Sequence, residues 1–269
     1  MTAPLIVRHG AMRSLGEFDP EAGTYRRGDE VVVRTERGLE LGQVVCESNP
    51  RAIAYLEEPT KGRIVRIVTD KDREERASHR LLERQELASC SRFVEERRLQ
   101  MEPIDVEHLF GGERLVFYFL AEKRVDFREL VKDLAREYHT RIELRQVGVR
   151  DEAKLLADYG DCGKPVCCNT HMTTMPPVSM RMAKVQKSTL DPSKISGRCG
   201  RLKCCLRFEQ DVYEEFQKEL PQVGVRVLTA KGQGRVLAQE ILARKVLVEF
   251  EDGRRLPVAV DEILTRLGK

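Results

Sequence analysis

Residues 104–121 read IDVEHLFGGERLVFYFLA, and this stretch indicates how the centre of the chain folds. Its two strand-like runs, 104–110 and 115–121, are joined through a Gly-Gly pair, which is typical of two strands connected by a turn. Before them, residues 72–101 predict a long charged helix, because apolar side chains recur on one face while the others are polar. The centre of the chain therefore begins with a helix followed by two strands.

A second helix and a third strand are expected after this stretch. Asp126 can cap a helix with Glu129 three residues on, and residues 141–149 alternate between apolar and polar as a strand does. The order helix, strand, strand, helix, strand predicts an α+β layer with helices on one face of a small sheet. It resembles KH-type and ferredoxin-like RNA-binding units, although the sequence has no Gly-X-X-Gly clamp loop. RNA contact is one hypothesis for this layer, and a platform with a merely solvated charged face is the other.

Small β modules are expected on both sides of this layer. After an irregular opening, residues 27–45 give two β-branched stretches separated by polar residues and Gly38, which predict a hairpin. Short β-rich runs over 223–263 predict a compact SH3-like barrel. We therefore expect an α+β protein: a small mixed central unit with flanking SH3-like β modules and a cysteine-rich cluster-binding segment. The predicted domains are residues 1–70, 71–157, 158–210 and 211–269.

Length and composition exclude several classes of protein. The chain has 269 residues, 41% of them hydrophobic, which is enough to bury a sizeable core and excludes a disordered chain. The longest apolar run, 115–121, is far shorter than the roughly 20 residues that cross a bilayer, so no membrane insertion is expected. The N-terminus has no pattern of a secretory signal, and we expect a cytoplasmic protein. In that compartment, eight cysteines are expected to be ligands or redox groups rather than disulfides.

The strongest motif is an internal repeat rich in cysteine. CGKPVCC at 162–168 recurs 37 residues later as CGRLKCC at 199–205, with the cysteines, the glycine and the basic residue in register. The predicted cluster- or metal-binding residues are Cys162, Cys167, Cys168, Cys199, Cys204 and Cys205. Residues 162–207 also contain nine Lys or Arg against one acidic residue, and such a block can offset the charge of thiolates.

The spacing of these cysteines leaves several chemistries open. A glycine after the first cysteine lets the backbone fold tightly, and plant-type iron–sulfur ferredoxins use the same four-residue gap. Four ligands, two from each copy, would suit a [4Fe–4S] cluster or a tetrahedral zinc ion, although the Cys-x2-Cys pairs of zinc ribbons are absent. A thiol–disulfide redox site and inert buried cysteines are the remaining alternatives. The stretch 169–198 between the motifs has little helix or strand pattern, so we expect its order to depend on the site.

Other candidate residues are interpreted as structural. Cys46 and Cys90 are expected to be small core residues, and His171 a surface histidine rather than a ligand. A soft apolar patch, more suited to packing than to coordination, consists of Met172, Met175, Met180 and Met182. The sequence has no His-Glu-x-x-His motif, phosphate-binding loop or nucleophile elbow, so no hydrolase or NTPase is predicted.

Four stretches together resemble the bacterial RicT (YaaT) family. They are RVDFRELVKDLA at 124–135, RIELRQVGVRDEAK at 141–154, VSMRMAK at 178–184 and DPSKISGRCGRLKCCL at 191–206. The resemblance runs from about Tyr25 into the C-terminal module, and the paired cysteine motifs are its most specific part. In that family the paired-motif cysteines bind an iron–sulfur cluster, which implies the same role for the six repeat cysteines here.

The resemblance also implies a function. It is that of a cytoplasmic, non-enzymatic regulator that acts with the small partners RicA and RicF on the endoribonuclease RNase Y, and so on mRNA processing and development. The alternative is a zinc- or cluster-stabilised nucleic-acid-binding protein that works alone. A thiol oxidoreductase using the vicinal pair Cys204-Cys205 is a third hypothesis.

Overall fold

The computed structural model describes residues 3–56, 59–157, 159–172 and 174–268. The chain forms two compact units, Met1–Met175 and Pro176–Lys269. The four domains predicted from the sequence divide the chain more finely than this, and their boundaries stay predictions. No helix in the described ranges is long and apolar enough to cross a membrane.

The first unit begins with a closed five-stranded barrel, in the order β1-β2-β5-β3-β4. Its strands are β1 (Leu5–His9), β2 (Ser14–Pro20), β3 (Glu30–Thr35), β4 (Gly38–Glu47) and β5 (Thr60–Ile67), with the short helix α1 (Pro50–Ile53) before β5. The β3–β4 pairing confirms the predicted hairpin. The irregular opening was a wrong prediction, because residues 5–20 form the hairpin β1–β2, whose turn begins at Gly10 with φ +68°. Two short strands gave too few alternating positions to be recognised.

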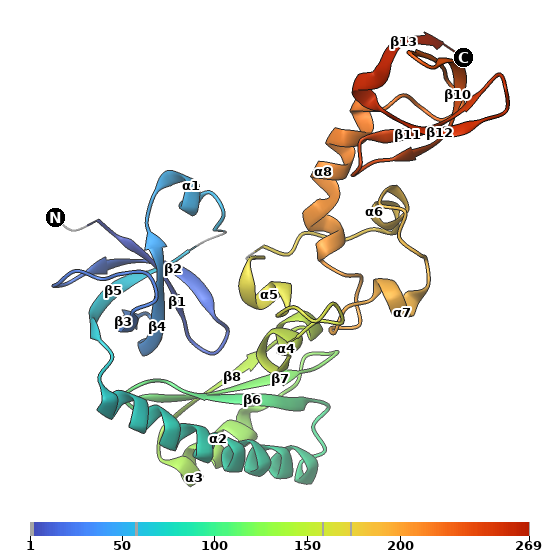
Figure 1. The fold of residues 1–269 in the computed structure, drawn as a ribbon. Helices are drawn as coiled ribbons and strands as arrows, with labels where there is room; N and C mark the ends of the chain where they lie inside the picture. The colour runs from blue at the N-terminus through green and yellow to red at the C-terminus, as the bar shows by residue number, and fades with distance from the viewer. Residues whose placement is uncertain (1–2, 57–58, 158, 173, 269) are drawn as a thin grey trace. The chain divides into compact units, whose positions relative to one another are not determined.

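The α+β layer has the predicted order of elements. It consists of α2 (Asp70–Glu96), β6 (Glu102–His108), β7 (Arg114–Leu120), α3 (Arg128–Tyr138) and β8 (Arg141–Gln146). The sheet order is β6-β7-β8, with β7 antiparallel to β6 and parallel to β8. Helices α2 and α3 lie on the same face of this sheet (Figure 1). The mixed α+β class is therefore confirmed.

The start of α3 differs from the prediction. Phe127 occupies the N-cap position without a side-chain cap, and Glu129 pairs with Lys132 at 2.8 Å instead of closing a capping box. The Asp126 carboxylate accepts a hydrogen bond from the backbone N–H of Arg128 at 3.2 Å and pairs with that arginine's guanidinium. The ion pair thus holds Asp126 one position before the cap.

Strand β7 is buried on both faces and joins the layer to the barrel. Leu115, Phe117 and Phe119 pack in one core with residues of α2 and α3. Val116 and Tyr118 point to the other face, where they pack with Met12 of the β1–β2 turn and with α4 (Val149–Leu156). Because the two faces of one strand serve two cores, the position of the barrel on the layer follows from β7.

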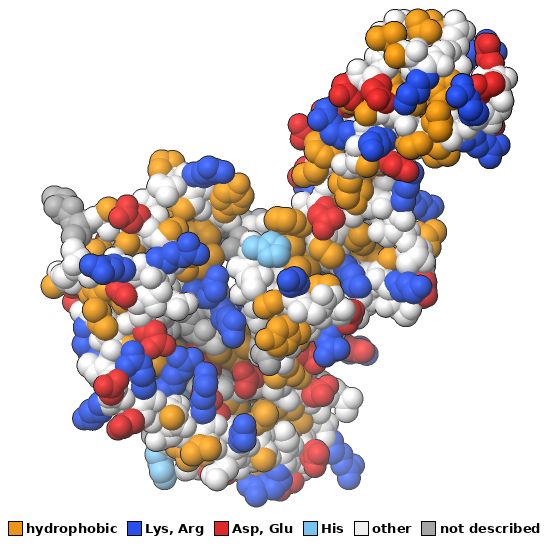
Figure 2. All heavy atoms as spheres, in the orientation of Figure 1, with side chains coloured by type: hydrophobic (Ala, Val, Ile, Leu, Met, Phe, Trp, Pro, Cys, Tyr) orange, Lys and Arg blue, Asp and Glu red, His pale blue; other side chains and the backbone are white. Residues whose placement is uncertain are grey.

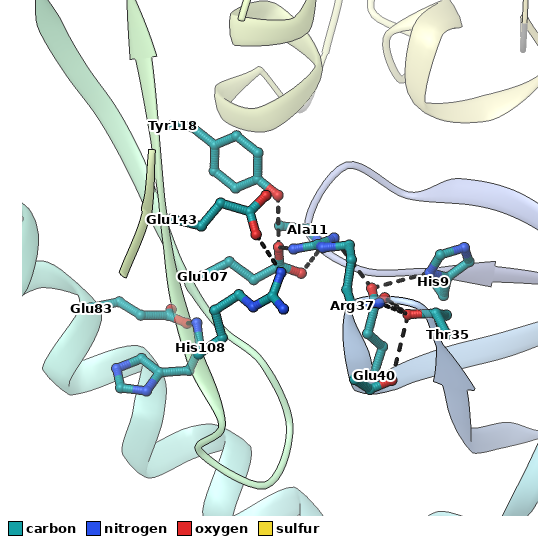
Figure 3. A network of polar contacts seen from close by, with 12 residues as sticks. His9, Ala11, Thr35, Arg37, Glu40, Glu83, Glu107, His108, Tyr118 and Glu143 are labelled. Carbon is teal, nitrogen blue, oxygen red and sulfur yellow. Dashed lines mark hydrogen bonds and ion pairs between the residues drawn. The ribbon is translucent and has the colours of Figure 1, made fainter. Parts of the chain in front are cut away.

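A network of buried polar groups crosses the same junction (Figure 3). Arg37, beyond β3, contacts Glu107 of β6 at 2.5 Å and Glu40 of β4 at 3.4 Å. Glu107 also accepts hydrogen bonds from the Tyr118 hydroxyl at 2.6 Å and from the backbone N–H of Ala11 at 2.7 Å. Burial alone would lower the pKa of Arg37, but the charges of Glu107, Tyr118 and Glu40 raise it, so this cation stays charged.

The second unit contains three α-helices, a short 3-10 helix (Val260–Glu262) and a sheet within residues 176–268. Its helices are α6 (Met180–Val185), α7 (Pro192–Ile195) and α8 (Cys205–Glu219). Its strands are β9 (Arg226–Thr229), β10 (Gly232–Glu240), β11 (Lys245–Phe250), β12 (Arg255–Ala259) and β13 (Ile263–Gly268), in the order β12-β11-β10-β9-β13. The C-terminal β module is thus present as a five-stranded sheet, while SH3-like architecture is not confirmed for either module.

The stretch between the cysteine motifs has more regular structure than we predicted. Helices α6 and α7 fall within it, and Ala183 and Ile195 are 0% and 4% exposed. Asp191 caps α7 by accepting from the backbone N–H of Ser193 at 3.0 Å, with Pro192 at the first helical position. Helices of four to six residues are too short to give a clear apolar period, which explains why the pattern did not reveal them.

We expect Glu107→Ala to destabilise the first unit by about 3 kcal/mol, because it removes the principal counter-charge of Arg37 and the acceptor of Tyr118. Urea unfolding followed by far-ultraviolet circular dichroism would measure this change. Glu113→Ala, at an exposed position of the β6–β7 turn, is the control and should change stability by less than about 0.5 kcal/mol. Equal effects of the two substitutions would contradict a structural role for the network.

Candidate metal centre

The first cysteine motif forms a tight turn followed by a short helix. Tyr159 and Pro165 make an isolated antiparallel bridge, and the backbone N–H of Gly160 donates to the Lys164 carbonyl at 2.8 Å. The backbone N–H of Gly163 donates to the Gly160 carbonyl at 3.0 Å, which closes the turn. Cys162 lies in this turn, and the adjacent pair Cys167-Cys168 begins α5 (Cys167–Thr170).

The second motif repeats this geometry at the same offset in sequence. Ser196 and Leu202 form the bridge, and the backbone N–H of Gly197 donates to the Arg201 carbonyl at 2.8 Å. The Gly200 N–H then donates to the Gly197 carbonyl at 2.9 Å. Each of these pairs lies 37 residues after its counterpart in the first motif. The sequence repeat is therefore also a repeat of backbone structure.

The glycine after the first cysteine has the same conformation in both copies. Gly163 has φ +74° and Gly200 has φ +71°, the left-handed region that a side chain disfavours. This agrees with the role predicted for that glycine, which is to let the chain turn sharply behind the cysteine. Sequence reasoning missed the earlier pair Gly160 and Gly197, although extending the repeat by two residues would have revealed it.

The six cysteines are divided equally between the two units. Cys162, Cys167 and Cys168 belong to the first unit, and the other three belong to the second. Cys162 is exposed, and the remaining five are partly exposed. Within the described ranges, no three His, Cys, Asp or Glu side chains lie close enough together to hold a metal ion. The structure thus describes two similar turns that carry thiols, and a shared centre stays a prediction.

The chemistry of these donors fits a cluster or a thiolate-bound metal. Both turns present sulfur near the protein surface, and the second carries Lys203 directly before its cysteine pair. Burial, followed by the neighbouring Cys204 and Glu209, raises the pKa of the Cys205 thiol, whereas Lys203 opposes that rise. A bound cation would remove this penalty, because metal ligation deprotonates a thiol.

The residues interpreted as structural lie outside the two motifs or at their edge. Cys90 is 0% exposed in the core under α2, where burial raises the pKa of its thiol to about 12, so its predicted core role is confirmed. Cys46 lies in β4 and is partly exposed. His171 is at the surface, as predicted. Met172 is buried, whereas Met180 is 40% exposed, so the predicted methionine patch is not uniformly buried.

Two family models match the chain. The PSP1 C-terminal conserved region matches residues 62–147, and the third domain of PSP1-like proteins matches residues 177–220. The chain is also 43% identical over 236 residues to the stage 0 sporulation protein YaaT of Bacillus subtilis, which covers 87% of the chain and 84% of that protein. The chain belongs to the YaaT (RicT) family. The resemblance seen in the sequence is thereby confirmed.

A shorter match comes from an organism outside the bacteria. An uncharacterized protein of Schizosaccharomyces pombe is 47% identical over 60 residues, which are 22% of this chain and 8% of that protein. No solved structure gives a significant match to the chain. In this member of the YaaT family, the first model spans the α+β layer and the second spans the motif at 199–205.

We expect Gly163→Ala and Gly200→Ala each to lower the melting temperature of this YaaT-family chain by about 2–4 °C, because each forces alanine into a left-handed conformation at a cost of about 1 kcal/mol. Differential scanning calorimetry would measure the shift. Gly160→Ala and Gly197→Ala, in the same turns, are matched controls. Neither glycine has a positive φ, and an added Cβ would meet its nearest atom at 3.6 Å and 3.8 Å, which is ordinary van der Waals contact. Equal shifts in all four variants would contradict the conformational explanation.

Proposed function

We propose that this chain is a cytoplasmic, non-enzymatic regulatory adaptor that binds an iron–sulfur cluster through its paired cysteine motifs. The observation that carries the proposal is the duplicated turn, in which glycine, basic residue and three cysteines occupy equivalent places in both units. Two similar turns that each expose thiols support a role as ligand-bearing loops, because inert core cysteines need neither the left-handed glycine nor exposure.

The ligands of a [4Fe–4S] cluster would come from both copies. Cys162 and Cys199 are each the only first cysteine of a motif, so each supplies one ligand. One cysteine from each adjacent pair completes the set of four, since neighbouring residues seldom reach the same centre without strain. The cluster would supply redox sensitivity, and the basic residues of 162–207 would offset the negative charge of the thiolates.

The regulatory part of the proposal rests on family membership. The relative from Bacillus subtilis is named a stage 0 sporulation protein, which supports a regulatory rather than a metabolic role. We infer that the chain acts with RicA-like and RicF-like proteins on RNase Y, and thereby on mRNA processing and developmental regulation. Cluster loss would then change the surface offered to these partners, because ordering of loops around a bound centre depends on that centre.

We expect anaerobically purified protein to contain iron and acid-labile sulfide, with broad absorbance near about 400 nm. Cys162→Ser and Cys199→Ser should each abolish most of this absorbance, because no neighbouring cysteine can replace the lost ligand. Single substitutions in either adjacent pair should retain more of it. Cys46→Ser, outside both motifs, is the control and should retain the full iron content.

Two results would contradict the cluster assignment. Stoichiometric zinc without sulfide would favour the zinc-stabilised nucleic-acid-binding alternative. Equal cluster loss from all six motif variants would refute the division of roles between the first cysteines and the pairs.

We expect RicA-like and RicF-like proteins from the same organism to co-purify with the cluster-loaded chain under anaerobic conditions. Cys199→Ser should weaken this association at least about tenfold, whereas Cys46→Ser should leave it unchanged. Titration by biolayer interferometry would measure both affinities. Partner binding that is independent of cluster content would reduce the centre to a structural element, and a complete lack of binding would contradict the adaptor role.

A further inference from the structure

The first unit contains a cavity of about 520 Å³ between the barrel, α2 and α4. Its volume falls in the range of about 300–1,000 Å³ that is typical of small-molecule sites. Figure 2 shows Lys and Arg side chains gathered on this part of the unit, between the barrel and α2. The paired cysteine motifs do not explain this concentration of charge.

Six Lys or Arg side chains line the cavity, and one of them, Arg73 of α2, is paired with Glu30 and Asp70. The other five are Arg8 of β1, Arg13 of the β1–β2 turn, Arg76 and Arg80 of α2, and Lys154 of α4. None of the five makes an ion pair with a carboxylate in the described part of the chain. Partial burial, together with repulsion from Arg8 and Arg13, lowers the pKa of Lys154. The fold therefore brings like charges together without pairing them directly with carboxylates.

The carboxylates of the cavity wall have other partners. Glu40 and Glu107 share Arg37, and Glu30 pairs with Arg73 at 2.9 Å. Two further wall carboxylates, Glu83 and Asp105, have pKa values raised chiefly by burial, which favours their neutral forms.

Each of these two carboxylates also accepts a backbone hydrogen bond, Glu83 from His108 at 3.2 Å and Asp105 from Val106. The wall carboxylates thus leave the five cations available for a ligand. An anionic ligand would supply the negative charge that these cations lack.

Unsatisfied polar atoms also mark this region. His9 lines the cavity and is 5% exposed, and its Nε2 has no hydrogen-bond partner among the described residues. An adjoining hollow of about 190 Å³ shares Arg8, Arg13 and Lys154 with the cavity. There, the buried Oδ1 of Asn169 also lacks a partner in the described part of the chain. Buried polar atoms rarely stay unpaired, so their position beside the cations points to an occupant.

We propose that this cavity binds a small phosphate-bearing molecule, whose phosphate groups contact Arg8, Arg76 and Lys154. Guanidinium groups match phosphate oxygens with paired hydrogen bonds, and lysine adds a compact charge. A di- or triphosphate chain has enough negative charge to meet several of the five cations at once. The site is distinct from the cysteine motifs and does not depend on a cluster.

The lining favours a small molecule over single-stranded RNA. RNA-binding grooves combine cations along a track with exposed aromatic platforms for base stacking. Here the cations converge on one hollow, and Phe110, the one Phe, Tyr or Trp in its described lining, is only 8% exposed. A base would therefore find no exposed ring of these types to stack on.

Isothermal titration of the full chain with inorganic pyrophosphate and, separately, with ATP tests the proposal. Both should bind the wild type at low salt, and Arg76→Gln and Lys154→Gln should each weaken binding at least about tenfold, because each removes a charge-assisted hydrogen bond. Arg84→Gln is the matched control, since this exposed arginine lies on the same helix but outside the cavity lining. It should change affinity less than about twofold, which separates local contacts from a general loss of charge.

Circular dichroism and thermal unfolding of each variant would establish that the fold is intact. The proposal is overturned if neither pyrophosphate nor ATP binds the wild type, or if Arg76→Gln and Lys154→Gln bind as tightly as Arg84→Gln. Binding of a single-stranded RNA oligonucleotide that depends on these residues, without binding of either small phosphate, would also overturn it. Cys162→Ser should keep phosphate binding, so failure of the cluster assignment would not affect this outcome.

Discussion

The position of the barrel on the α+β layer in the first unit depends on how the partly buried guanidinium of Arg37 is neutralised. Arg37 belongs to the barrel, yet its closest carboxylate is Glu107 of the α+β layer. A desolvated charge is costly unless it is paired, so the barrel is stable on the layer only where Glu40 and Glu107 both reach this guanidinium. Tyr118 gives Glu107 a further hydrogen bond from the strand that fills both cores. Apolar packing brings the two parts together, and the charges select one arrangement.

That arrangement has a consequence for the cavity. The groups that line it belong to β1, α2, β6 and α4, which become neighbours only when the barrel is seated on the layer. Arg37 occupies Glu40 and Glu107, which would otherwise be available to the cations of the cavity wall. The network that fixes the junction therefore also leaves the five cations without carboxylate partners. The pairing of Arg37 with Glu40 and Glu107 therefore leaves the neighbouring cations available to an anion.

The central layer and the paired motifs could be predicted because their signals are local. A continuous apolar run such as 115–121 is visible within a few residues, and the cysteine repeat needs only the alignment of two short segments. The Arg37–Glu107 pair, by contrast, joins positions 70 residues apart. The cavity cations at positions 8, 13, 76, 80 and 154 share no sequence pattern. Their proximity results from packing, which a single sequence does not display.

Two hydrogen bonds connect the helix of the first cysteine motif to residues that line the cavity. The side-chain amide of Asn169, in α5, donates to the Lys154 carbonyl at 2.7 Å, and Arg8 donates to the Thr170 carbonyl at 3.3 Å. Cys168 lines the hollow that contains the same arginine and lysine. A phosphate that draws the Arg8 guanidinium into the cavity would therefore remove one contact of α5, while the bond from Asn169 to the Lys154 backbone would remain.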